Sequence, residues 1–429
     1  MVKIKLQKYC TLILSVFLII QLLGCTTSTG EISAEESEIV KTITMWKFRS
    51  NKEDYVINRW VKQWNEENPN LQVNFELISY NDYLTNRLPT AFATNSAPDI
   101  YMISAGSFLK YAKAGYMLPL DEYINSEMKN DLNQESLKVA TYNEKILGIP
   151  IEREPIALFY NKKAFKKLQL EPPTTWGELE NSAKQLQSDE MSGICLPTQV
   201  NDYQNFIFYT FLMQAGTTNS NNETVNDFGL SGAKALNLWR NLAKYNYTQG
   251  TNVEMPSDIY PFATGKSAMQ VCGFWAVNSL KKYYPDSEYG VVPVPYPKGG
   301  RNISVSGGWY QAVNTSSEYA KEAAEFTMWM WGEDTSRPFE WCTEASTKVP
   351  ARKSVIEKNR NIFYDGVNSL FTKDILPSSF PEPRYPVEIS NTISNALQDA
   401  MYSEKDINEI AKSAEDEMNK YINTHSELF

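Results

Sequence analysis

Residues 40–48 read VKTITMWKF, in which apolar and polar side chains alternate as they do in a half-buried strand. Residues 54–68 carry apolar side chains at helical spacing and predict a helix that ends before a proline. Residues 71–79, LQVNFELIS, alternate again, a second helix is expected around residues 80–95, and residues 97–103, APDIYMI, predict a third strand. This order of elements predicts an α/β fold with a parallel sheet and right-handed crossovers.

The rest of the chain continues to alternate between strand and helix. A strand leading into a helix is expected over residues 156–167, and a capping box opens a helix at Thr175–Glu178. The other expected elements are strands within residues 265–275 and over 305–313, a helix over 317–331, and two C-terminal helices with apolar stripes from Ile389 to Ala400 and from Ile407 to Met418, the second capped by Ser403 with Asp406. Two sets of α/β units predict two lobes joined by more than one crossover, with a ligand cleft between them.

The composition excludes several classes of protein. The chain has 429 residues, 42% of them apolar, which predicts two or three folded units rather than a disordered chain. Its formal net charge of −10 makes nucleic acid a poor partner. The single histidine, His425, excludes a His dyad, a Ser-His-Asp triad and a two-histidine metal site, and we expect no metal and no cofactor.

The N-terminus has the features of an export signal. Three lysines precede the apolar run of residues 12–23, which is too short for a membrane-spanning helix. Residues 22–25, Leu-Leu-Gly-Cys, resemble a bacterial lipobox, so we expect residues 1–24 to be a signal peptide and Cys25 to carry lipid. The polar residues 25–39 predict a flexible tether. The alternatives are an uncleaved anchor and an ordinary signal beside a chance cysteine.

The remaining cysteines suggest no redox or zinc chemistry. Cys195, Cys272 and Cys342 are an odd number and form no CxxC motif. We expect buried free thiols, although one disulfide among them remains possible.

Eight segments in order carry a family resemblance. They are TITMWKF, PNLQVNFE, APDIYMI, GIPIEREPIALFYNKKAFKK, PPTTWGEL, FATGKSAMQVCGFWAV, VSGGWYQAVNTSSEYAKEAAEFTMWM and TKVPARKSV. Over about residues 40–425 the chain resembles extracellular solute-binding protein family 1, the sugar-binding proteins of ABC importers that include the maltose-binding proteins.

The resemblance implies a type II periplasmic-binding-protein-like fold, with two α/β lobes around a hinge. Its function would be to capture a sugar, in particular an oligosaccharide, and to deliver it to ABC transporter permease subunits, without catalysis. We expect a monomer that is lipid-anchored on the extracellular face of the bacterial membrane. By analogy the N-terminal lobe takes residues 40–152 and 304–348, and the C-terminal lobe residues 153–303 and 349–429.

A sugar needs flat aromatic surfaces for its C–H face and planar polar groups for its hydroxyls. Trp275 follows a glycine that ends a strand and matches an aromatic position of the family, and we expect it to be the main stacking surface. Trp46, Trp309 and Tyr83 are further aromatic candidates. The alternative is core packing for Trp46 and an ordinary position on a helix face for Tyr83. We expect Trp46, Trp275 and Trp309 to converge on one groove. The remaining tryptophans in predicted helices are expected to pack in cores: Trp60, Trp64, Trp176, Trp329 and Trp331.

The polar and glycine candidates come from strand ends and late loops. The resemblance implies ligand contacts for Asp99, which could instead cap a turn, and for Glu152 or Arg153, which could instead be a solvated hinge. The other candidates are Gly307 and Gly308, which would allow close approach, and Arg352 and Arg384 on loops expected to return to the cleft. The arginines would also suit an acidic sugar.

Two other functions compete with sugar capture. A membrane-anchored glycoside hydrolase would need two carboxyl groups flanking the scissile bond, and Asp99, Glu152 and Glu154 offer no spacing that selects a pair. A carbohydrate-binding surface adhesin would lack a permease partner. A P-loop at residues 265–267 is excluded because Tyr260 occupies the position of the first glycine.

Overall fold

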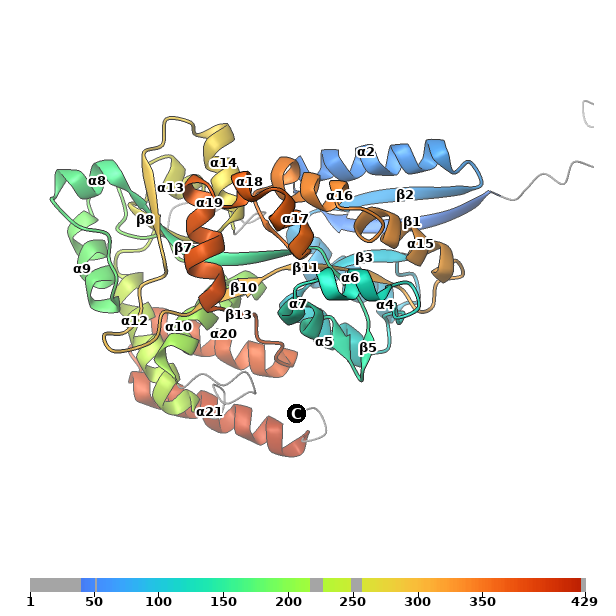
Figure 1. The fold of residues 1–429 in the computed structure, drawn as a ribbon. Coiled ribbons are helices and arrows are strands. Elements are labelled where there is room, and N and C mark those ends of the chain that lie inside the picture. Colours follow the sequence, from blue (N-terminus) through green and yellow to red (C-terminus); the bar gives the residue numbers. More distant parts are fainter. Residues whose placement is uncertain (1–39, 51, 217–226, 248–256, 426–429) are drawn as a thin grey trace, which may run out of the picture. The chain divides into compact units, whose positions relative to one another are not determined.

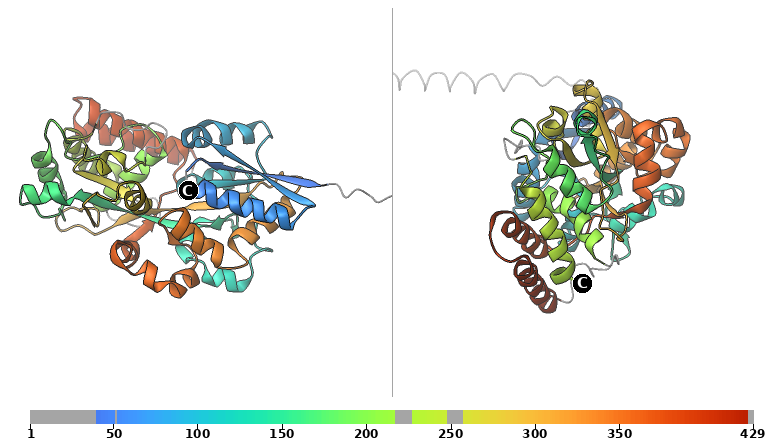
Figure 2. Two further views of the ribbon diagram at one scale, coloured as in Figure 1. Left: turned by 90° about the horizontal axis from the view of Figure 1, so that it is seen from above. Right: turned by 90° about the vertical axis from the view of Figure 1, so that its left-hand side faces the viewer.

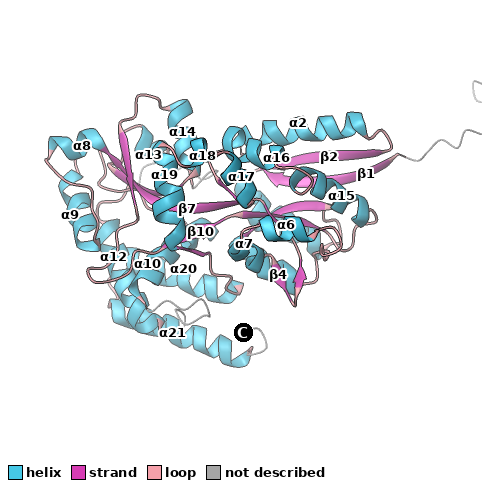
Figure 3. Ribbon diagram, in the orientation of Figure 1, coloured by secondary structure: helices cyan, strands magenta, loops and turns pink. Residues whose placement is uncertain are grey.

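The computed structural model describes part of the chain: residues 40–50, 52–216, 227–247 and 257–425. The predicted signal peptide, tether and lipidated Cys25 lie outside the described residues. The described chain forms two large sheets, with helices packed on both (Figures 1 and 3). A two-stranded ribbon, β4 (Thr141–Tyr142) and β5 (Lys145–Ile146), lies apart from them.

The first sheet contains the three predicted N-terminal strands. Its strands, in spatial order, are β2 (Leu71–Ile78), β1 (Lys41–Phe48), β3 (Ile100–Ser104), β11 (Trp309–Val313) and β6 (Ile149–Pro150). The prediction of parallel pairing is confirmed for β1 with β2 and for β1 with β3. The sheet as a whole is mixed, because β11 runs antiparallel to both β3 and β6.

The helices of the first sheet bury aromatic side chains against it. Helix α2 (Lys52–Glu67) lies along β2, and α15 (Ala320–Trp331) packs against β11 (Figure 1). Of the five tryptophans predicted to pack, four are buried in this core: Trp60, Trp64, Trp329 and Trp331. The fifth, Trp176, is partly buried against a core of the second sheet. The helix expected around residues 80–95 forms as α3 (Tyr80–Asp82), the π-helical η2 (Tyr83–Arg87) and α4 (Leu88–Ala93). The smaller helices on this side are α5 (Ala105–Lys113), α6 (Ser126–Asp131), α7 (Gln134–Val139), α16 (Ser336–Glu340), η4 (Trp341–Ala345), α17 (Lys353–Lys358) and α18 (Arg360–Phe363).

The second sheet is organised around one long strand, β7 (Glu152–Asn161). This strand pairs with β8 (Met269–Gly273), β9 (Tyr289–Val292), β10 (Ser304–Gly307) and β12 (Val349–Pro350), and β13 (Ser379–Pro381) pairs with β10. The predicted strand into helix 156–167 is confirmed as β7 followed by α8 (Lys162–Lys167). The other elements on this side are α9 (Trp176–Leu186), α10 (Asp202–Ala215), η3 (Phe228–Gly232), α12 (Ala233–Ala243), α13 (Tyr260–Ala263), α14 (Trp275–Tyr283), α19 (Gly366–Ser369), η5 (Leu370–Ile375) and η6 (Leu376–Ser378).

Two predicted helix caps can be compared with the structure. The capping box of α9 is confirmed, since the Thr175 hydroxyl accepts from the Glu178 backbone and the Glu178 carboxylate accepts in return. For the last helix, α21 (Ile407–Thr424), the N-cap is Asp406 rather than Ser403, because the Asp406 carboxylate accepts from Asn408 N and Glu409 N. The predicted apolar stripes of α21 and of α20 (Val387–Tyr402) are buried, and these helices pack together beside α12 (Figure 2).

The chain passes between the two sheets at neighbouring points. Residues 305–313, predicted as one strand, are divided at Gly308 into β10 in the second sheet and β11 in the first. A Cβ atom on Gly308 would lie 2.4 Å from the carbonyl oxygen of Glu152, so only glycine permits this approach. Beside it, Ile151 N donates to Trp309 O at 3.0 Å where β6 leads into β7.

The first sheet has one hydrophobic core, and the second sheet has two, on opposite faces of β7. We call the core of the first sheet the first core, and the core of the second sheet that contains α10 the second core. Ala351, Val355 and Phe363 pack in the core of the first sheet although they follow residue 348. The exact lobe boundaries stay a prediction. As expected, the three cysteines are buried and unpaired. Within the described residues, no helix is long and apolar enough to cross a bilayer, and no group of three or more potential metal ligands occurs.

We predict that Gly308→Ala destabilises the fold by about 1–3 kcal/mol, the usual result of forcing atoms into a packed region. Gly177→Ala in α9 is the matched control, because a Cβ there meets no atom within 4 Å. The control is expected to be neutral or stabilising by about 0.4–1 kcal/mol. Urea denaturation of both variants measures the difference. Equal stabilities would show that the crossing is not tightly packed.

Candidate functional site

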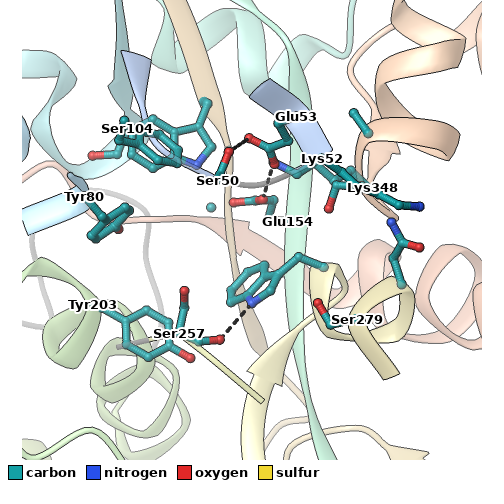
Figure 4. A pocket seen from close by; sticks show the side chains of 18 of the residues that line it. Ser50, Lys52, Glu53, Tyr80, Ser104, Glu154, Tyr203, Ser257, Ser279 and Lys348 are labelled. Atoms are coloured by element: carbon teal, nitrogen blue, oxygen red, sulfur yellow. Dashed lines mark hydrogen bonds and ion pairs between the residues drawn. The ribbon is translucent and has the colours of Figure 1, made fainter. Parts of the chain in front are cut away.

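A cavity lies where side chains from the first core and the second core meet. It holds about 1120 Å³ of empty space, part of which is open to solvent. Its walls come from β1, α2, α3, β3, α10, α14, the Gly307–Trp309 crossing and the segment around Lys348. Figure 4 shows Tyr80 and Tyr203 on one side of this space and Glu53, Glu154 and Lys348 gathered on another.

One wall of the cavity is an aromatic group from the first core. The ring centroids of Phe48 and Trp309 are 4.3 Å apart, and those of Phe48 and Tyr80 are 5.1 Å apart in an edge-on arrangement. Tyr80 and Trp309 complete the contact at 6.3 Å. We call Phe48, Tyr80 and Trp309 the first aromatic trio.

A second aromatic trio, Tyr203, Phe206 and Trp275, belongs to the second core. Its ring centroids are 6.3–6.4 Å apart. The Trp275 indole folds back over Gly273, where an added Cβ would lie 1.8 Å from the ring, and its Nε1 donates to Ser257 O at 3.2 Å. The glycine before this tryptophan thus permits the orientation that brings the ring to the cavity. Aromatic faces from two cores therefore meet one space.

Beside the trios lies a buried ion cluster centred on Lys348. Its Nζ lies 3.0 Å from Glu53 Oε1, 3.3 Å from Glu152 Oε1 and 2.9 Å from Glu154 Oε1. Burial alone would lower the pKa of Lys348, but the three glutamates together raise it well above its usual value. Burial raises the pKa of Glu152 and of Glu154 in spite of the lysine.

The cluster extends to a second lysine and to the chain crossing. Lys47 Nζ lies 3.0 Å from Glu53 Oε2 and 3.3 Å from Asp54 Oδ1. Burial would raise the pKa of Glu53, but Lys348 and Lys47 lower it to about 2. Trp309 N donates to Glu152 Oε1 at 3.2 Å, which ties the first aromatic trio to the ion cluster.

Two further acids, Asp202 and Glu382, stand between this cavity and an adjoining one of about 1290 Å³. The two cavities share Leu84, Ser104, Asp202 and Glu382 as lining residues. Gly106 N, at the start of α5, donates to Glu382 Oε2 at 3.1 Å. The Ser107 hydroxyl donates to Asp202 Oδ2 at 3.4 Å. Burial and the charge of Asp202 raise the pKa of Glu382 to about 8.

The structure brings four of the sequence-predicted site residues to the cavity: Gly307, Gly308, Trp275 and Trp309. It does not bring Trp46 there, because this ring packs against the first core beneath the Arg87 guanidinium, 5.1 Å from its centroid. The expected convergence of three tryptophans therefore holds for two of them. Phe48, two residues after Trp46 on the same face of β1, takes the wall position instead.

Tyr83 and Asp99 have structural partners instead of positions on the cavity wall. Tyr83 is fully buried, and its hydroxyl donates to Met102 O at 2.7 Å. The Asp99 carboxylate accepts from Thr44 N at 2.6 Å and from the Ser317 hydroxyl, so it joins two distant segments, a role that was not predicted.

The charged candidates also lie outside the cavity. Glu152 lies directly behind it in the ion cluster, and Arg153 is half-buried on the other face of β7. Arg352 donates to Asp131 Oδ2 at 2.7 Å and to backbone carbonyl groups. Arg384 donates to Val139 O at 3.0 Å. Neither arginine loop presents its guanidinium to the cavity, because each guanidinium is engaged by acceptors of other segments.

Several cavity residues were not predicted. They are the aromatic residues Phe48, Tyr80, Tyr203 and Phe206 and the charged residues Glu53, Asp202, Lys348 and Glu382. Two of these charged residues lie in the loops that were predicted to return to the cleft. Glu382 is two residues before Arg384, and Lys348 is four residues before Arg352. Phe48 is the last residue of β1 and Tyr80 follows the end of β2, which is the position where a sheet of this type presents its ligand residues.

The comparisons with known proteins agree with this geometry. The chain matches the family of bacterial extracellular solute-binding proteins over residues 50–335. A multiple sugar-binding protein of Streptococcus mutans is 25% identical over 326 residues, covering 72% of this chain and 74% of the relative.

Two solved structures share the fold. An ABC transporter solute-binding protein of Thermotoga lettingae, bound with α-D-tagatose, has a TM-score of 0.77 at 25% identity and covers 89% of this chain and 99% of its own. The GacH receptor of Streptomyces glaucescens, solved unliganded and with acarbose, has a TM-score of 0.77 at 22% identity and covers 90% of this chain and 99% of its own.

The fold is therefore the two-lobed α/β fold of periplasmic binding proteins, as predicted. The chain belongs to the bacterial extracellular solute-binding protein family. Members of that family are binding proteins that act outside the cell.

The raised pKa of Glu382 predicts a pH dependence of stability. Between its usual value of 4.5 and about 8, the folded protein holds a proton on Glu382 that the unfolded chain releases. The free energy of unfolding therefore decreases as pH rises through this range, by at most about 1.4 kcal/mol per pH unit from this group. Glu382→Gln is expected to flatten the dependence in denaturation curves from pH 5 to pH 8. The exposed Glu404→Gln is the matched control, and an unchanged slope in the Glu382 variant would contradict the assignment.

Proposed function

We propose that this protein is the substrate-binding component of an ABC importer that captures a sugar, in particular an oligosaccharide. The observation that carries the proposal is the meeting of two aromatic trios, one from the first core and one from the second, at a single cavity. Aromatic faces bind the C–H face of a sugar ring, and the carboxyl and hydroxyl groups beside them bind its rim of hydroxyls. The names of the relative and of the structural neighbours, which include bound α-D-tagatose and acarbose, support the same class of ligand.

The arrangement suggests how binding is coupled to delivery. A sugar held between Trp309 of the first trio and Trp275 of the second contacts both lobes at once. Such a ligand has a higher affinity for the closed form than for the open form and shifts the population toward closure. The closed form is then recognised by the permease subunits. The lobe boundaries predicted from the sequence, 40–152 with 304–348 and 153–303 with 349–429, remain a proposal for this division.

We further propose that the protein acts as a monomer held at the outer face of the membrane by lipid on Cys25. Two acyl chains anchor stably, whereas one chain gives only marginal binding. The anchor would keep the receptor concentrated near its permease.

We propose a binding role rather than hydrolysis of a glycoside. A hydrolase needs one carboxylic acid and one free carboxylate or base on either side of the scissile bond. Glu53 and Glu154 are both held by Lys348, which favours a structural role for them. Incubation of the protein with oligosaccharides, followed by chromatography, tests this choice. Cleavage products would overturn it.

The first experiment is a thermal-shift screen against mono- and oligosaccharides. A ligand present at 100 times its Kd stabilises the fold by about 2.7 kcal/mol. A sugar that raises Tm supports the proposal, and a panel without effect argues against it.

Once the screen has identified a sugar, calorimetry measures how tightly each variant binds it. Trp275→Ala is predicted to weaken binding of this sugar at least about tenfold, because the main stacking surface is removed. Trp46→Ala is the control, since that tryptophan lies outside the cavity wall and its loss is expected to leave the affinity unchanged. Circular dichroism verifies that both variants are folded. If Trp275→Ala bound as tightly as the parent protein, the assignment of the stacking surface would be wrong.

The anchor has its own test. Expression of the full chain with labelled palmitate is predicted to label the parent protein and to leave Cys25→Ser unlabelled. Cys10→Ser, within the expected signal peptide, is the control and should remain labelled. Label on the Cys25→Ser variant would contradict lipidation at that residue.

A further inference from the structure

Some charged groups around the cavity are fully engaged in ion pairs within the protein, and others can still bind a ligand. The buried cation, Lys348, has three N–H donors and three glutamate partners, so none of its donors remains for a ligand. Lys47 is buried and engaged with Glu53, Asp54 and Phe48 O. An anionic ligand would thus find no uncommitted buried cation among these lysines.

The remaining cations around the cavity are near the solvent. Lys52 is half-buried at the start of α2, and Lys282 is exposed and donates to the Tyr283 hydroxyl at 2.9 Å. Lys110 on α5 lines the adjoining cavity and is also exposed, and its charge opposes the rise in the pKa of Asp202 that burial causes. Exposed charges are screened by water and salt, so they contribute little to the selection of a ligand. No arginine is among the described residues that line the cavity. The arginines predicted from the sequence, Arg352 and Arg384, are used elsewhere.

The uncommitted groups are acids. Glu382 is only 8% exposed yet lines both cavities, and one of its oxygens, Oε2, accepts from Gly106 N. Within the described part of the chain, its Oε1 accepts no hydrogen bond. Asp202 faces the same shared wall from the N-terminus of α10, with the Ser107 hydroxyl as its partner. Carboxyl oxygens there can accept bonds from sugar hydroxyls. An anionic group, in contrast, would find no buried cation among the described lining residues that is free to compensate its charge.

We propose, on the basis of the function proposed above, that the cavity binds uncharged saccharides and excludes anionic ones, with Asp202 and Glu382 as the specificity-determining acceptors of ligand hydroxyls. Both acids lie at the junction of the two cavities. A sugar chain that extends from the aromatic trios into the second cavity would pass them. Acidic sugars would have been suitable ligands if Arg352 and Arg384 lined the cavity. Since they do not, we expect acidic sugars not to bind.

The test compares matched probes at pH 7 and low salt. Maltotriose, cellotriose and xylotriose are the neutral probes, and trigalacturonate and a sulfated disaccharide are the anionic ones. We expect stabilisation by at least one neutral probe and none by the anionic probes. Stabilisation by an anionic probe alone would overturn this inference and leave sugar capture intact. An absence of any stabilisation would overturn both.

Two variants then test the acids directly. Asp202→Ala and Glu382→Ala each remove acceptor oxygens. Each is expected to weaken the best neutral probe at least about tenfold and thereby to reduce the ratio of neutral to anionic affinity. Asp189→Ala removes an exposed acid that lines neither of the two cavities and is the matched control. Circular dichroism and Tm establish folding, and the conservative Asp202→Asn offers a second test if the alanine variant is unstable. Unchanged affinity and selectivity in folded variants would overturn the assignment.

Discussion

The ion cluster around Lys348 is the constraint on which the site depends. A buried ammonium group is unfavourable by itself, and here three glutamates compensate it, from α2 and from the start of β7. Loss of one partner from such a buried cluster typically costs about 3–5 kcal/mol, because the other charges remain unpaired. Through Glu152 the cluster also binds the backbone of Trp309, so it fixes the crossing between the sheets and one aromatic wall of the cavity together.

In this cavity, different acids shape the wall and accept hydrogen bonds from a ligand. Glu53 and Glu154 line the cavity but are held by Lys348, so they shape and polarise its wall. Asp202 and Glu382 line the wall that this cavity shares with the second one, and they can accept further hydrogen bonds. The aromatic trios between them supply contact area that requires no charge. A polyhydroxylated, uncharged ligand fits all three features.

Local patterns allowed much of the fold to be predicted. The strands β1 and β2 and the capping box of α9 are properties of short segments, and all three are confirmed. The division of 305–313 at Gly308 depends on a contact with Glu152, more than 150 residues earlier in the chain, and no local pattern records it. The same applies to the site. Trp275 was predicted because a glycine and a strand end surround it, whereas Lys348 and Glu382 were missed because the loops were right but side-chain direction within a loop depends on packing.

The central claim is that aromatic groups from two cores hold one sugar in one cavity. A crystal structure of the protein with a stabilising saccharide tests it most directly. A sugar ring in contact with both Trp275 and Trp309, with its hydroxyls within hydrogen-bond distance of Asp202 or Glu382, is the predicted result. A sugar bound elsewhere, or one that touches the trio of a single core, would contradict the claim.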